Sequence, residues 1–174
     1  MIRVAITGPE SSGKSELAVE LSRYFIAPFA PEYAREYLSK RDGKYALKDL
    51  DAIAAGQLRY EVRAVAKASK LCFFDTDMLV MEVWSEFRFG KVSPFIQKAM
   101  DSPFYSHYLL CYPDLEWTDD ALRESPDLSE RLELFQLYEA KLKEVNVPYF
   151  IVKGKGKHRW HAAADWIKEI LGKN

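Results

Sequence analysis

Eight consecutive residues near the amino terminus have the types and the spacing of a phosphate-binding loop. The segment follows the pattern Gly-x-x-x-x-Gly-Lys-Ser, between an apolar run and a helical pattern. In such a loop the backbone N–H groups surround phosphate oxygens, the lysine reaches the β- and γ-phosphates, and the hydroxyl binds Mg²⁺. The pattern predicts that the following residues bind a nucleoside triphosphate, with Ser15 also on the metal: Gly8, Glu10, Ser11, Ser12, Gly13, Lys14 and Ser15.

Carboxylates that follow predicted strands are the next candidates for chemistry. Asp75 ends the apolar run 71–75, a position from which a carboxylate holds Mg²⁺ through water. Asp77 either faces the same cleft or caps the next helix, since aspartate favours that position. Glu32 follows the second predicted strand, where it accepts a proton from an attacking hydroxyl, binds substrate hydroxyls, or lies in the first turn of an exposed helix.

Gln57 is a polar residue on the apolar side of a predicted helix. A buried amide needs a hydrogen-bonding partner, which is either a substrate or a buried backbone group. The pattern by itself favours the backbone partner.

A long segment rich in Pro, Asp and Ser, at about 113–131, is predicted to form a lid, because long connections of this kind are often functional. Arg123 and Arg131 would close over the transferring phosphate and neutralise its charge. The alternative is that both arginines lie on the surface and pair with neighbouring acids, namely Asp119, Asp120 or Glu124.

The basic segment 153–159 follows the last predicted strand, where a nucleotide base packs against backbone or the loop is simply solvated. We assign no base contact to a single residue. The guanine-recognition pattern Asn/Thr-Lys-x-Asp does not occur nearby, which favours ATP over GTP.

Apolar runs and helical stripes alternate along the chain, and this alternation predicts how the candidate residues are positioned. The predicted strands are 2–7, 27–30, 71–75, 107–112 and 149–152. The predicted helices are 14–26, 32–40, 48–69, 77–87, 93–101, 130–145 and 158–172. We therefore expect an α/β fold of three layers, with a five-stranded parallel sheet, helices on both faces, and ligands beyond the carboxyl ends of the strands.

The composition bounds the possible functions. The 174 residues suffice for one domain, 1–174, and the 25 basic and 26 acidic residues give a net charge of −1. This balance argues against nucleic acid or an anionic membrane as a partner. Cys72 and Cys111 lie in apolar runs and are expected to be buried thiols rather than zinc ligands. We find neither a signal peptide nor an apolar stretch of ~18 residues, so we expect a cytoplasmic protein.

Several of these segments together resemble the ribosylnicotinamide kinase domain of the bacterial NadR proteins. This domain is similar to P-loop nucleoside kinases, and it could also be classified as an AAA-type NTPase. The resemblance covers roughly residues 2–170. It rests on the phosphate loop and on the motifs Glu32-Tyr33-Ala34-Arg35-Glu36-Tyr37, Gly56-Gln57-Leu58-Arg59-Tyr60, Phe74-Asp75-Thr76-Asp77 and Glu116-Trp117-Thr118-Asp119-Asp120-Ala121-Leu122-Arg123, with Arg131 where a second lid arginine is expected.

The resemblance implies phosphorylation of nicotinamide riboside to nicotinamide mononucleotide, with ATP as donor and Mg²⁺ as cofactor. It implies catalytic roles for Lys14, Glu32, Asp75, Arg123 and Arg131. It also implies substrate binding by Glu32, Tyr33, Arg35, Gln57, Asp77 and Trp117. The nicotinamide ring is cationic and suits an aromatic partner. The candidates are Tyr33, Trp84 and Trp117.

The bifunctional relatives carry an adenylyltransferase domain before the kinase. Here Met1 directly precedes the first predicted strand, so we expect that domain to be absent and the acceptor to be less certain. A kinase of another nucleoside or small metabolite, or a regulatory NTPase switch, remains an alternative. A nucleic-acid ATPase is disfavoured by the balanced charge.

Overall fold

The structure is a computed structural model that describes residues 1–101, 104–118 and 123–173. Its centre is a five-stranded sheet with the strand order β2-β3-β1-β4-β5 and all neighbours parallel. The strands are β1 (Ile2–Thr7), β2 (Phe29–Ala30), β3 (Leu71–Asp75), β4 (His107–Cys111) and β5 (Tyr149–Val152). The predicted five-stranded parallel sheet is confirmed.

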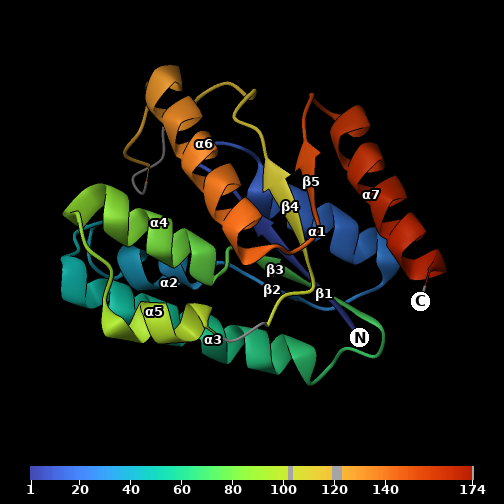
Figure 1. The fold of residues 1–174 in the computed structure, drawn as a ribbon, viewed down its shortest axis with the longest axis horizontal. Coiled ribbons are helices and arrows are strands. Elements are labelled where there is room, and N and C mark those ends of the chain that lie inside the picture. The colour runs from blue at the N-terminus through green and yellow to red at the C-terminus, as the bar shows by residue number, and fades with distance from the viewer. Residues whose placement is uncertain (102–103, 119–122, 174) are drawn as a thin grey trace.

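Helices cover both faces of the sheet (Figure 1). On one face lie α1 (Lys14–Phe25) and α7 (Lys157–Gly172). On the other face lie α2 (Tyr33–Ser39), α3 (Leu47–Val65), α4 (Met78–Phe89), α5 (Pro94–Met100) and α6 (Leu128–Val145). The three-layer arrangement that the alternation of strands and helices predicts is therefore present.

The inner strands supply side chains to two separate cores, because successive residues of a strand face opposite sides of the sheet. In β1, Val4 and Ile6 pack against α1 and α7, whereas Ala5 faces the other helical layer. In β3, Phe73 faces α1 and α7 and Phe74 faces the other helical layer, and all five of these side chains are fully buried. Burial on both faces explains why these strands read as continuous apolar runs.

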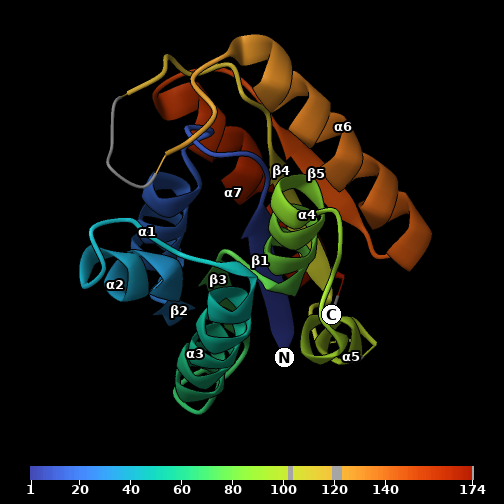
Figure 2. The same ribbon diagram turned by 90° about the vertical axis from the view of Figure 1, so that its left-hand side faces the viewer.

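The central position of β1 creates the crevice in which a ligand binds. β1 pairs with β3 on one side and with β4 on the other, so the connections after these strands diverge to opposite sides. Crevices of this kind form at the carboxyl ends of the strands. In Figure 2 the start of α1 and the chain leaving β4 lie at this same end of the sheet.

Several boundaries differ from the prediction, and the differences at β2 and α3 have a plain physical reason. β2 has two residues instead of the predicted four, because Pro28 and Pro31 flank it and proline cannot donate a ladder hydrogen bond. The long helix α3 ends at Val65, since the chain from residue 66 must turn to enter β3.

Cys72 and Cys111 are buried free thiols, as predicted. Within the described ranges, no helix has the length and hydrophobicity that crossing a bilayer requires.

We expect Gly8→Ala to lower the free energy of unfolding by roughly 2 kcal/mol or more, because it combines backbone strain with a clash. Gly8 has φ 127, and a Cβ atom there would lie 2.7 Å from the carbonyl oxygen of Cys111. Urea denaturation followed by circular dichroism measures this loss.

Gly90→Ala is the matched control. Gly90 also has a positive φ, 66, but a Cβ atom there meets nothing within 4 Å. It therefore adds strain without the clash, and its loss of stability should be the smaller one. Equal losses in the two variants would contradict the close packing of the phosphate loop on β4.

Candidate functional site

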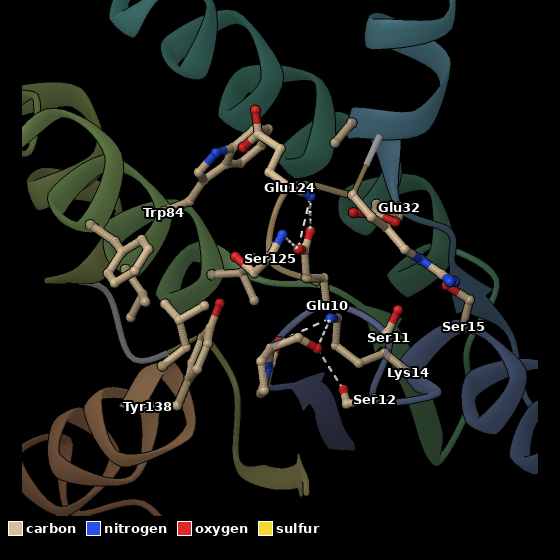
Figure 3. Close-up of a pocket in the computed structure, with 18 of the residues that line it drawn as sticks. Glu10, Ser11, Ser12, Lys14, Ser15, Glu32, Trp84, Glu124, Ser125 and Tyr138 are labelled. Carbon is tan, nitrogen blue, oxygen red and sulfur yellow. Dashed lines mark hydrogen bonds between the residues drawn. The ribbon is translucent and has the colours of Figure 1, made fainter. Parts of the chain in front are cut away.

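A cavity of about 270 Å³ opens at the carboxyl end of the sheet. Its walls come from the phosphate loop 8–15, the start of α2, one side of α4, the segment 123–125 and α6. In Figure 3 the phosphate-loop residues Lys14 and Ser15 lie on one side of Glu10, and Trp84 and Tyr138 lie on the other. One cavity thus contains a polar half and an aromatic half.

The phosphate loop is closed by its own hydrogen bonds. The Lys14 Nζ donates to the carbonyl oxygens of Gly8 at 2.9 Å and Pro9 at 2.8 Å, and the Ser12 hydroxyl donates to the Pro9 carbonyl at 2.6 Å. Gly13, with φ 76, precedes α1 and allows the loop to enter the helix directly. The first turn of α1 then presents free N–H groups, which favour an anion. All predicted nucleotide-binding residues line the cavity.

Ser15 and Asp75 form the side of the site that suits a metal. Burial and the charge of Glu32 raise the pKa of Asp75 to about 6, while a hydrogen bond from Ser15 opposes the rise. Asp75 is buried, and among the described residues its Oδ1 atom has no hydrogen-bond partner. An unpartnered buried carboxylate oxygen beside a hydroxyl fits Mg²⁺, which protein sites bind with few carboxylates plus phosphate oxygens.

Glu32 and Arg35 lie on the cavity wall near the phosphate loop. The Arg35 Nε donates to the Glu32 carboxylate at 3.1 Å, and the Glu32 side chain is 22% exposed. Because Glu32 also raises the pKa of Asp75, the two carboxylates are close enough to interact electrically. Glu32 is therefore a carboxylate on the cavity wall that lies near Asp75, whereas the other lining glutamates are Glu10, Glu16 and Glu124.

Gln57 and Tyr33 do not line the cavity. The Gln57 Oε1 accepts a hydrogen bond from the Tyr33 backbone N–H at 2.9 Å, and its amide points to the carbonyls of Asp75 and Thr76 at 3.5 and 3.4 Å. Gln57 thus ties the start of α2 to the end of β3, which is the backbone role that its pattern favoured. Tyr33 packs edge-on against Tyr60. The substrate contacts of Gln57 and Tyr33 stay predictions.

Asp77 is the N-cap of α4 rather than a cavity residue. Its Oδ1 accepts hydrogen bonds from the Val80 backbone N–H at 3.2 Å and from the Thr7 hydroxyl at 3.1 Å, and the residue is fully buried. Burial raises the pKa of Asp77 to about 6. This geometry is that of the capping alternative, and the ligand contact of Asp77 stays a prediction.

The segment that carries Arg123 is fastened onto the phosphate loop. The carboxylate of Glu10 accepts hydrogen bonds from the backbone N–H groups of Glu124, at 2.9 Å, and of Ser125 (Figure 3). Arg88 on α4 holds the same segment through an ion pair with Glu124 at 3.1 Å. Arg123 lines the cavity beside these contacts. The described part of this segment thus contacts the phosphate loop, and its role as a lid stays a prediction.

Trp117 and Arg131 lie outside the cavity lining. The Arg131 guanidinium is 5.7 Å from the centre of the Trp117 ring, and that of Arg123 is 6.0 Å from it. Arg131 is buried and donates to the Leu115 carbonyl at 3.4 Å. Trp117 therefore packs beside Arg123 and Arg131, and its substrate contact stays a prediction. The part of the predicted motif at residues 119–122 lies outside the described residues.

Several residues that shape the site were not predicted from the sequence. Arg88, Tyr138 and Glu124 line the cavity, and Arg159 binds the phosphate loop from behind. Glu61 is a fully buried acid that accepts a hydrogen bond from the Tyr105 hydroxyl at 2.9 Å. Burial raises the pKa of Glu61 to about 8. Glu61 lies four residues after Gln57 on α3, and residues so spaced share one helix face. This spacing could have predicted that Glu61 is buried beside Gln57.

The sequence profile of the family described as AAA domain matches residues 3–159. The trifunctional NAD biosynthesis/regulator protein NadR of Salmonella typhimurium is 33% identical over 97% of this chain, and the NadR of Escherichia coli is 32% identical over the same share. The chain spans 42% of the length of each of these relatives.

Solved structures agree with this similarity. NadR in complex with NR superimposes with a TM-score of 0.85 and 27% identity, over 98% of this chain and 52% of that one. NadR in complex with NAD and AMP-PNP gives a TM-score of 0.81 and 25% identity, over 97% of this chain and 49% of that one. A deoxyadenosine kinase from M. mycoides shares the fold. It superimposes with a TM-score of 0.63 and 16% identity, over 99% of this chain and 100% of that one. The resemblance to NadR and the three-layer P-loop fold are confirmed.

We expect the protein to lose stability as the pH rises from about 6 to about 8, because burial disfavours ionised Glu61. Its pKa in the folded state is about 8 against an ordinary 4.5, so the folded protein retains this proton in a range where the unfolded chain has lost it. The raised pKa values of Asp75 and Asp77, about 6, act in the same direction at lower pH. Urea denaturation at pH 6, 7 and 8 measures the slope.

Glu61→Gln tests the assignment, because glutamine keeps the shape and the hydrogen-bonding oxygen but does not ionise. Its unfolding free energy should depend less on pH in this window. A slope equal to that of the wild type would show that another group titrates.

Proposed function

The chain belongs to the family described as AAA domain, and from this membership and the contents of the cavity we propose that it is an ATP-dependent kinase of a small nucleoside. The proposal rests on one observation above all. The phosphate loop, Glu32 and an aromatic wall border the same cavity, so a donor triphosphate and an acceptor hydroxyl can meet there. A hydrolase needs only the first of these components.

The proposed reaction is an in-line transfer of the γ-phosphoryl group to a sugar hydroxyl. The Lys14 ammonium leaves the carbonyls of Gly8 and Pro9 and binds the β- and γ-phosphates. Mg²⁺ held by Ser15 and Asp75 supplies charge neutralisation at the phosphates. The donor is ATP, in keeping with the AMP-PNP complex of a NadR protein.

Glu32 receives the proton of the acceptor hydroxyl in this proposal. It lies on the cavity wall, whereas the buried Asp75 is directed to the metal side beside Ser15. A carboxylate within hydrogen-bonding reach both orients the hydroxyl and takes its proton late in the transfer. Arg123, which also lines the cavity, neutralises the charge that develops on the moving phosphoryl group. Arg131 supports it from within the lid.

Nicotinamide riboside is the acceptor that we propose. The NadR structure in complex with NR is among the similar ones. The cavity offers Trp84, Phe87 and Tyr138 to a ring, and aromatic faces attract a cationic ring such as nicotinamide. Nicotinamide mononucleotide is then the product.

An acceptor screen tests this function. Protein, ATP and Mg²⁺ are mixed with nicotinamide riboside or a panel of other nucleosides, and ADP formation is followed. We expect nicotinamide riboside to accelerate ADP formation strongly, and Lys14→Ala to reduce the accelerated rate by about 10² or more, since one transition-state donor contributes that much. Lys168→Ala removes an exposed α7 lysine that pairs with Asp165 and should leave the rate unchanged.

The outcomes separate the parts of the proposal. Acceleration by another nucleoside alone would exclude nicotinamide riboside as the acceptor but leave a nucleoside kinase. ADP formation that ignores every acceptor would contradict the kinase. A normal rate in Lys14→Ala would contradict the phosphate site itself.

Trp84 provides a test of the acceptor half of the cavity. We expect Trp84→Leu to raise the KM for nicotinamide riboside about fivefold, because an aromatic face contributes on the order of 1 kcal/mol to cation binding. Trp84→Phe keeps an aromatic face but loses the hydrogen bond from Nε1 to Tyr45, 2.8 Å long. It should therefore raise this KM less. Similar increases in both variants, or an increase in the KM for ATP, would contradict ring stacking on Trp84.

A further inference from the structure

Arg159 is a buried arginine that binds three different loops at the ligand-binding end of the sheet. Its side chain is 7% exposed and lies in the first turn of α7. The Nη2 atom donates to the carbonyls of Ser12 at 2.6 Å and Tyr112 at 3.3 Å. The Nη1 atom donates to Asp114 at 2.8 Å and to the Gly154 carbonyl at 3.0 Å. A buried guanidinium with so many partners is fixed in position.

Asp114 completes the connection between the loops. It forms an ion pair with Arg159, and its second oxygen accepts a hydrogen bond from the Gly154 backbone N–H at 2.6 Å. Asp114 stands where the chain leaves β4 toward the lid, and Gly154 follows β5. The phosphate loop, the root of the lid and the loop after β5 are therefore held together by one arginine and one aspartate.

The contact with Ser12 determines the direction of a phosphate-facing group. In a planar trans peptide the C=O of one residue and the N–H of the next point in opposite directions. Because the Ser12 carbonyl points at Arg159, the N–H of Gly13 points away from Arg159. Gly13 itself lines the cavity. A Cβ atom on Gly13 would lie 2.8 Å from Leu115 and 3.7 Å from the Arg159 Nε, so the peptide is also confined from behind.

We propose that Arg159 is a positioning residue for the phosphoryl donor. It orients the Ser12–Gly13 peptide toward the phosphates. Through Asp114 it also fixes the start of the segment after β4 and the loop after β5 relative to that peptide. This inference rests on the proposed kinase function for the identity of the donor. Arg159 does not contact the donor. It acts through the backbone of the phosphate loop.

Arg159→Lys keeps the charge but removes the planar set of donors that reaches four partners. We expect the Kd for Mg·ATP, measured by titration calorimetry without an acceptor, to rise about tenfold or more, because the Ser12–Gly13 peptide loses the charge-assisted hydrogen bond that orients it. Asp114→Asn should shift it in the same direction by a smaller factor. In turnover, the KM for ATP should rise, and the KM for nicotinamide riboside should stay near the wild-type value.

Arg3→Lys is the matched control. Arg3 lies at the other end of β1, where its guanidinium donates to the Phe104 carbonyl at 3.1 Å and covers the Phe104 ring. The variant loses a guanidinium hydrogen bond and packing on a ring, far from the phosphate loop. Its thermal stability should fall while its Kd for Mg·ATP stays at the wild-type value.

A folded Arg159→Lys protein that binds Mg·ATP as tightly as the wild type, with only a lower melting temperature, would overturn the proposal. Should Arg159→Lys not fold, the same criterion applies to Asp114→Asn. The result is independent of the acceptor screen. If no acceptor accelerated ADP formation, the kinase function would be contradicted. The Kd for Mg·ATP would still test the positioning role of Arg159.

Discussion

The conformation of the phosphate loop depends on hydrogen bonds that its carbonyl oxygens accept from the protein itself. Lys14 and Ser12 bind the carbonyls of Gly8 and Pro9, and Arg159 binds that of Ser12. With the carbonyls engaged on the protein side, the N–H groups are left for an anion. The loop is thus organised before a ligand arrives, and binding needs chiefly the movement of the Lys14 side chain.

The surrounding elements are attached to this loop rather than merely close to it. Glu10 holds the lid segment at Ser125, Asp75 approaches Ser15 from β3, and α7 reaches it through Arg159. All these contacts converge at the carboxyl end of β1 because β3 and β4 flank that strand. The phosphate loop is therefore in direct contact with the segment at Ser125, with β3 and with α7.

Features that depend on local sequence were predictable. The phosphate loop could be identified because its glycines and its lysine are required at a fixed spacing, and the buried strands because both of their faces are apolar. The contacts of Arg159 with Ser12 and of Glu10 with Ser125 join residues 147 and 115 positions apart. No local pattern encodes such pairs. For Asp77 and Gln57, the pattern allowed a structural and a functional role. The structure shows the hydrogen bonds of the structural role, and the functional role stays a prediction.

The central claim is that one cavity brings the donor phosphates and the acceptor hydroxyl together. The most direct measurement is mass spectrometry of the products after ATP, Mg²⁺ and nicotinamide riboside are incubated with the protein, with inorganic phosphate assayed in parallel. The account predicts nicotinamide mononucleotide in equal amount to ADP, with little free phosphate. ADP accompanied by an equal amount of inorganic phosphate and unchanged nicotinamide riboside would contradict it.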